Sequence, residues 1–310
     1  MHCTLERRVE TEETLRRRIE TVSDLQAIVR TMKALSAVSS RHYERVLKTL
    51  GDYTQTLEMG LQVALRGRAF EKPRGEERGT RLAAVVFGSD VGLCGRFNED
   101  LVELLVAKMN AVNLPIAGLS VLAVGARIDA RLGDLGHPVE ETCITPGSPD
   151  GITATVRQIL RKLDEWQDRS IDQVLLFYSQ SGRPRLLHLL PIDLLQFSGL
   201  IRKPWPSHVL PIHTLQADRL LAGLIRQHLF VSLFRACAES LASEHQMRLR
   251  AMQAAESNIQ ERLEDLVVAF RNQRQDAIDA ELLDIGAGFE AVASDTQAAA
   301  RPGVAHRVDG

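Results

Sequence analysis

Glycine and proline are missing from two very long stretches of this 310-residue chain, one near each end. The first glycine is Gly51 and the first proline is Pro73, and neither residue occurs between Leu224 and Ile285. Because these residues cost the most inside a helix, and the second stretch is dense in Ala, Leu, Glu, Gln and Arg, both stretches are predicted to be helical. At 1.5 Å per residue the second helix would be on the order of 90 Å long, so it must project from any globular body.

Apolar residues recur every three or four positions in both stretches, which is the seam of a coiled coil. The N-terminal series is Leu15, Ile19, Val22, Leu25 or Gln26, Val29 and Met32. The C-terminal series is Ile259, Leu263, Leu266, Phe270, Ile278, Leu282 and Ile285. Since neither seam is stable in water alone, we expect the two ends of the chain to form a long antiparallel two-helix coiled coil.

The middle of the chain alternates short apolar or β-branched runs with helical stretches, which predicts a small Rossmann-like α/β domain with a parallel sheet. The predicted strands are Leu82–Phe87, Leu119–Val124 and Val174–Tyr178, and the predicted helices are Asn98–Asn113 and Thr153–Arg169. The expected organisation is a coiled-coil helix at 1–70, the α/β domain at 80–207, a second coiled-coil helix at 212–293 and a disordered tail at 294–310, where Pro and Gly return.

The composition excludes several classes of function. Lys and Arg number 38 against 40 Asp and Glu, so the net charge does not favour binding to nucleic acid. The run Arg16, Arg17, Arg18 spreads around most of the circumference of a helix, which is typical of a solvated or partner-facing surface. The cysteines Cys3, Cys94, Cys143 and Cys237 have no disulfide or metal spacing. No signal-like or membrane-spanning apolar run is apparent, and hydrolase motifs are missing. We expect no catalytic site, cofactor, metal or small-molecule substrate.

One glycine-bearing loop, GSDVGLCGRFN at 88–98, lies between a predicted strand and helix, where phosphate-binding loops occur. It contains neither of the two phosphate-loop signatures, G-x-x-x-x-G-K-S/T and G-x-G-x-x-G. We therefore favour a tight turn that needs a positive φ at Gly92 or Gly95. Asn98, followed by two acidic residues, is the predicted N-cap of the next helix.

Three stretches resemble, in the same order, motifs of the gamma subunit of F-type ATP synthases, and they bracket nearly the whole chain. The stretch LRRRIETVSDLQAIVRTM at 15–32 is similar to that family's opening helix, and GSDVGLCGRFN is similar to its S-D-R-G-L-C-G-G-F-N, the most specific of the three. The third comprises SEHQMRLRAMQAAESNI from Ser243 and RQDAIDAELLDIGAGFEAV from Arg274. The residues matching the family's central loop are Ser89, Asp90, Gly92, Leu93, Cys94, Gly95 and Asn98.

The resemblance implies a non-catalytic rotor shaft. The coiled coil would stand inside a ring of alpha and beta subunits, and the α/β domain would sit below it with epsilon and the membrane c-ring, on the cytoplasmic face of a bacterial inner membrane. By the same resemblance, Arg274 and Gln275 would contact a beta-subunit loop, and Arg248 and Met32 would lie near the region where beta pushes the shaft. Packing is the favoured role for Met32, and contact for the others. Arg30 and Gln26 complete the predicted partner contacts.

Several alternatives stay open at this point. A coiled-coil scaffold or tether would also need long helices, although it would not need the strand, loop and helix around 88–98. An enzyme with a nucleotide-binding α/β domain would bind ATP as an isolated chain. Departures from all three motifs leave open whether the complex is the housekeeping ATP synthase or a divergent second ATPase. The coupling ion, H⁺ or Na⁺, and the direction of work are likewise open.

Overall fold

The chain divides into two compact units, each containing parts of both long helices. The computed structural model describes residues 11–66, 81–112, 118–171, 173–205, 211 and 214–299. The first unit, the body, is Thr31–Gln253, and the second combines the segments on either side of it, up to Arg30 and from Ala254. We call the described part of the second unit the distal pair. The division falls inside the long helices α1 (Glu12–Leu65) and α6 (Ala217–Ala299), and not between the domain ranges expected from the sequence.

The distal pair is an antiparallel pair of helices, as the sequence predicts. The Gln26 side chain donates a hydrogen bond to Gln260 at 2.9 Å, and one turn later Arg30 lies 3.4 Å from the Glu256 carboxylate. Residue numbers thus rise on α1 as they fall on α6. Leu15 and Leu266 are buried between the helices, and Gln26 occupies the seam position, because Leu25 is 47% exposed.

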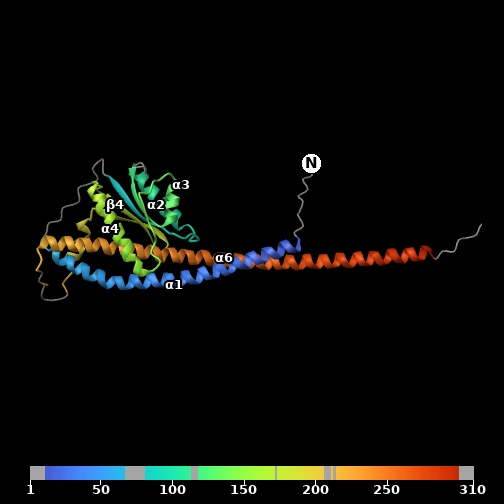
Figure 1. Ribbon diagram of the computed structural model, residues 1–310. Helices are drawn as coiled ribbons and strands as arrows, with labels where there is room; N and C mark the ends of the chain where they lie inside the picture. Colours follow the sequence, from blue (N-terminus) through green and yellow to red (C-terminus); the bar gives the residue numbers. More distant parts are fainter. Residues whose placement is uncertain are drawn as a thin grey trace, which may run out of the picture. The chain divides into compact units, whose positions relative to one another are not determined.

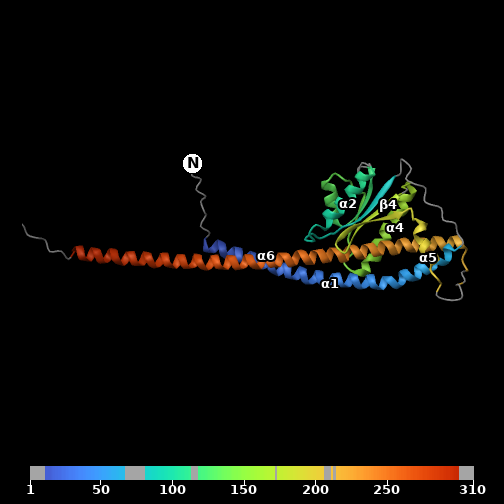
Figure 2. The same cartoon turned by 180° about the vertical axis from the view of Figure 1, so that it is seen from behind.

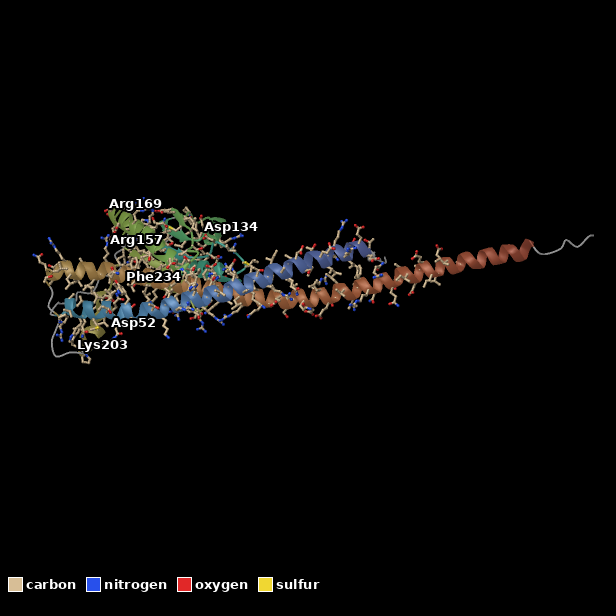
Figure 3. All side chains as sticks on the ribbon, turned by 60° about the horizontal axis from the view of Figure 1, so that its bottom comes forward. Asp52, Asp134, Arg157, Arg169, Lys203 and Phe234 are labelled. Carbon is tan, nitrogen blue, oxygen red and sulfur yellow. The ribbon has the colours of Figure 1, made fainter. Side chains whose placement is uncertain are left out.

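Helix α6 continues alone past the first turn of α1 (Figure 1). Glu12 lies fourteen residues before Gln26, which places it level with Arg274, fourteen residues after Gln260. The predicted seam residues Ile278, Leu282 and Ile285 are exposed, because the described part of α1 does not extend far enough to cover them. Side chains on this part of α6 stand away from any neighbouring element (Figure 3).

Helix α6 also runs six residues further than the predicted end at Ala293. The segment Ser294–Ala299 contains no glycine or proline, the two residues that most readily end a helix. The rest of the predicted tail, 300–310, lies outside the described residues.

The body contains a five-stranded sheet in the order β3-β2-β1-β4-β5. The first four strands in this order are mutually parallel, and β5 pairs antiparallel with β4. The strands are β1 (Leu82–Phe87), β2 (Ser120–Val124), β3 (Glu141–Cys143), β4 (Gln173–Gln180) and β5 (Arg183–Leu190). The predicted α/β domain with strands 1, 2 and 4 is confirmed. The sequence missed β3, which has three residues, and β5, whose charged and apolar residues mark a partly exposed edge strand.

Helices cover both faces of the sheet (Figure 2). Helices α2 (Phe97–Ala111) and α3 (Ala126–Asp134) pack on one face, where Leu105 and Ile128 are completely buried. Helix α4 (Ile152–Asp168) and α6 pack on the other, around Trp166 and Leu233. This second core also includes Tyr43 of α1, so both long helices are part of the body's interior.

A third apolar cluster joins the last turns of α1 to the first turns of α6. It includes Leu61, Leu65 and Leu221, together with Phe197 of the short segment η3 (Leu194–Phe197), which precedes α5 (Ser198–Arg202). Contrary to the expectation from sequence, the part Ala217–Gly288 of α6 is long enough to span a membrane and contains an 18-residue window with a mean hydropathy of 1.2. That test is also met by core helices of soluble proteins, and Leu221, Val231 and Leu233 of α6 are buried in the body.

Candidate functional site

The segment Gly88–Asn98, here called the motif loop, joins β1 to α2 at the carboxyl edge of the sheet and includes the first two residues of α2. Gly95 adopts a φ of 62°, as predicted, but the second residue with positive φ is Leu93, at 64°, and not Gly92. A left-handed conformation is unfavourable for a residue with a Cβ, so other contacts must hold Leu93 in place. The large apolar side chains at the tip point outward, with Val91 55% exposed and Leu93 60% exposed.

The base of the motif loop is held by a buried amide. The Asn98 carbonyl oxygen accepts a hydrogen bond from the Ser89 backbone N–H at 3.1 Å, and its amide nitrogen donates to the Ser89 hydroxyl at 2.9 Å. The predicted N-cap role of Asn98 is therefore wrong: Arg96 occupies the N-cap position, and the Asn98 side chain spans the loop instead. Cys94 packs beside this pair, and burial raises the pKa of its thiol.

Asp90 connects the motif loop to the segments that follow β2 and β3. One carboxylate oxygen accepts from the Ala126 N–H at 2.7 Å and so caps α3, and the other accepts from the N–H and hydroxyl of Thr145, at 2.7 and 2.6 Å. Gly125, at a φ of 117°, is needed because a Cβ there would lie 2.7 Å from the Ser89 carbonyl. These contacts give Asp90 a structural role.

Arg248 of α6 binds the tip of the motif loop. Its guanidinium donates to the carbonyl oxygens of Val91 and Gly92 at 2.7 and 3.2 Å, and to the Glu244 carboxylate at 2.6 Å. The residue is only 4% exposed. The structure therefore corrects the prediction that Arg248 contacts a partner subunit. A buried guanidinium must satisfy its donors locally, and this one does so within the chain.

Two ionisable groups next to Arg248 are shifted in opposite directions. Burial raises the pKa of Glu244 to about 7, against the opposing attraction of Arg248. Burial, together with the positive charge of Arg248, lowers the pKa of His245 to about 4. The His245 ring stacks on Tyr43 of α1, with centroids 5.7 Å apart, so this stack joins the two long helices beside Arg248.

Two serines of α6 extend these contacts along the carboxyl edge of β1 and β4. The Ser240 hydroxyl donates to the Phe87 carbonyl at 3.2 Å, and the Ser243 hydroxyl donates to the Ser179 carbonyl at 3.1 Å. Ligands of open α/β sheets bind in the crevice at this edge. In this chain, side chains of α6 occupy that position. Ser240 was not predicted as a site residue from the sequence. A helical signal was available, because Ser240 precedes Ser243, Glu244 and Arg248 by three, four and eight residues, which places all four on one helix face.

The other predicted contact residues lie outside this cluster. Arg274 and Gln275 are exposed on α6 in the distal pair, and Met32 is half-buried on α1 in the body. Gln26 and Arg30 already contact α6, although the Arg30 side chain remains 60% exposed. Within the described residues, no group of three or more His, Cys, Asp or Glu side chains is placed to hold a metal ion.

Comparisons with known proteins agree on one family. A family profile described as ATP synthase matches residues 11–292. The ATP synthase gamma chain of Bacteroides thetaiotaomicron is 32% identical over 221 residues, covering 67% of this chain and 74% of that relative. That of Nitratiruptor sp. is 24% identical over 262 residues, covering 83% and 87%.

Solved structures share the fold. The rotor of the Euglena gracilis mitochondrial ATP synthase in rotational state 1 matches with a TM-score of 0.59 and 16% identity, covering 86% of this chain and 98% of that one. A chain of the OSCP/F1/c-ring assembly of the same enzyme in rotational state 3 matches with a TM-score of 0.62 and 16% identity, covering 96% and 99%. The extent of the profile match and the identity to the Bacteroides relative establish that this chain belongs to the ATP synthase gamma chain family.

Proposed function

We propose that this chain is the non-catalytic central-stalk rotor of a membrane-associated F-type ATP synthase, coupling ion flow through a membrane ring to ATP synthesis or hydrolysis in an alpha and beta head. The observation that carries the proposal is the continuity of α6. The helix is bonded to the sheet through Ser240 and Ser243 and to the motif loop through Arg248, and it runs without interruption to Ala299. A torque applied to the body is thereby transmitted to the end of the same helix.

The exposed apolar residues at the far end of α6 fit a shaft inside a sleeve. Ile278, Leu282 and Ile285 are 48%, 62% and 53% exposed. Apolar surface of this kind is stabilised when a partner removes it from water. Apolar contacts lack the direction of hydrogen bonds, so a ring of alpha and beta subunits can cover this helix and still let it turn.

Catalysis by the complex would then depend on the angle of the shaft. The distal pair is not symmetric, so rotation presents a different surface to each beta subunit in turn. Differences in contact energy would shift each subunit among its nucleotide-binding states. Arg274 and Gln275 are the proposed polar contacts with a beta-subunit loop, supported by their exposure on α6. Arg30, which keeps much of its side chain exposed, is a secondary contact, while Gln26 and Met32 serve mainly in packing.

The remaining partners follow from the same proposal. The α/β body binds epsilon and the c-ring, and the protein is peripheral on the cytoplasmic face of a bacterial inner membrane, held there by its partners. Nucleic acid and small-molecule substrates are not partners. The structural neighbours, a mitochondrial ATP synthase rotor and a chain of an OSCP/F1/c-ring assembly, are in keeping with this assignment.

The test is reconstitution with the alpha, beta and epsilon subunits, followed by an assay of ATP hydrolysis. Charged hydrogen bonds contribute about 1.5 to 3 kcal/mol, so Arg274→Ala with Gln275→Ala should change the rate of hydrolysis about tenfold or more. The matched control is Arg262→Ala, an exposed arginine of the same helix, which should leave the rate near that of the unaltered complex. A chain that forms no complex with these subunits would support the scaffold or tether instead.

A further inference from the structure

The tip of the motif loop depends on α6 for its shape. We infer that the Glu244–Arg248 pair sets the conformation of this loop, and that the fixed loop is needed to couple rotation to ATP hydrolysis. The first half of the inference concerns the chain alone. The second half rests on the proposed rotor function and on the exposed Val91 and Leu93 side chains of the tip, whose apolar surface a partner subunit would cover.

The first argument comes from the loop itself. Leu93 is a non-glycine residue at a φ of 64°, and the outward Val91 and Leu93 side chains gain little burial in return. Nothing in these side chains favours the observed shape. In the described part of the chain, the tip carbonyls are held by Arg248, apart from a 4.0 Å contact of the Cys94 thiol with the Val91 carbonyl.

The second argument concerns the orientation of Arg248. Glu244 lies one turn earlier on α6, and its carboxylate is 2.6 Å from the guanidinium, with both side chains nearly completely buried. A buried ion pair adds little stability compared with apolar residues of similar volume, because both charges lose their hydration. Its value lies in geometry, since a planar guanidinium can donate to the carboxylate and to two carbonyl oxygens at once.

The third argument is that separate residues hold the base and the tip. Asn98 and Asp90 fix the base through contacts that do not involve α6. A cavity of about 560 Å³, lined by the motif loop and α3, lies beside the tip. Loss of the Glu244–Arg248 pair would therefore release the tip into available space and leave the base in place.

The Cys94 thiol packs beside Ser89 and Asn98 of the base and lies 4.0 Å from the Val91 carbonyl of the tip, so movement of the tip uncovers the thiol while the base stays in place. This residue is 2% exposed within the loop, and Cys143 and Cys237, which are equally buried, lie elsewhere in the body. In a full-length Cys3→Ser background, maleimide should label Cys94 at least about fivefold faster in Arg248→Lys and Glu244→Gln than in the parent. Labelling of Cys237 should not change, which excludes global unfolding. Arg235→Lys, at an exposed arginine of α6 that bonds Thr54, is the matched control.

Coupling is measured in the whole complex, reconstituted in vesicles. We expect Arg248→Lys and Glu244→Gln to keep ATP hydrolysis but to lower the number of ions pumped per ATP by about twofold or more. Arg235→Lys should keep the parent ratio. A purely structural role would lower both rates together and leave the ratio unchanged.

The outcomes separate the inference from the proposed function. Unchanged labelling of Cys94 in both variants would overturn the inference, as would faster labelling with an unaltered ratio of ions to ATP. If the parent complex itself pumped no ions on ATP addition, the rotor function would fail, while the labelling result would still decide whether the pair holds the loop.

Discussion

The body and the distal pair are built from the same two helices but are stabilised in different ways. In the body, the helices bury aromatic and aliphatic side chains against a sheet and place serine hydroxyls on strand carbonyls. In the distal pair, buried seam residues such as Leu15 and Leu266 are few, and the polar contacts lie at the surface. The contacts that stabilise the body lie within this chain, whereas the distal pair leaves apolar side chains exposed for partner subunits to cover.

The largest expected difference in the free energy of unfolding is between substitutions at one core residue of the body and at one residue of the distal pair. Trp166 is completely buried and bonds Glu140, so Trp166→Ala should lower the free energy of unfolding by about 3 to 5 kcal/mol. Leu282 is 62% exposed, so Leu282→Ala should change it by less than about 0.5 kcal/mol. Urea unfolding of the full chain measures both. Comparable losses at the two sites would mean that the distal pair has a core of its own.

A second test concerns the opposite pKa shifts beside Arg248. As pH falls below 6.5, unfolded His245 gains a proton before the folded form does, so this residue lowers stability down to about pH 4. As pH falls below about 7, folded Glu244 gains a proton before the unfolded form does, so it raises stability down to about pH 4.5. The two contributions oppose each other in the parent protein.

Removing either group should reveal the other. Between pH 7 and pH 5, His245→Gln should gain stability relative to the parent and Glu244→Gln should lose it, each by on the order of 1 kcal/mol. Urea midpoints of the full chain at the two pH values provide the measurement. Shifts of the same sign in both variants would contradict the assigned directions.

The smallest effect is expected in the distal pair. Arg30 is 60% exposed and its contact with Glu256 is 3.4 Å, so Arg30→Gln should cost less than about 1 kcal/mol in the isolated chain. The loss should vanish in 1 M salt, which screens surface charges. A larger loss, measured by thermal unfolding, would show that surface pairs do stabilise this region, and a loss that persists in 1 M salt would assign it to packing of the Arg30 side chain instead of its charge.

The sequence predicted the elements whose signals are local. The lack of glycine and proline predicted α1 and α6, and the run Leu82–Phe87 matches β1 residue for residue. It did not predict β5, because a charged edge strand lacks a continuous apolar run. Nor did it place Arg248 and Asn98 correctly, because their partners lie 156 and 9 residues away and the choice between surface and interior depends on tertiary contacts. Glu244 and Ser240 gained their roles in the same way.

The antiparallel register of the distal pair also has a consequence in time. The Gln26 side chain cannot form its hydrogen bond until Gln260, 234 residues later in the chain, has been synthesised. At the usual 5 to 20 residues per second, a ribosome needs on the order of 10 to 50 seconds to make that interval. During this interval, the apolar seam of the newly synthesised N-terminal helix has no C-terminal helix of its own chain to pack against. The distal pair is thus among the last parts of the molecule to form, and until then the apolar residues of its N-terminal helix stay open to contacts with other chains.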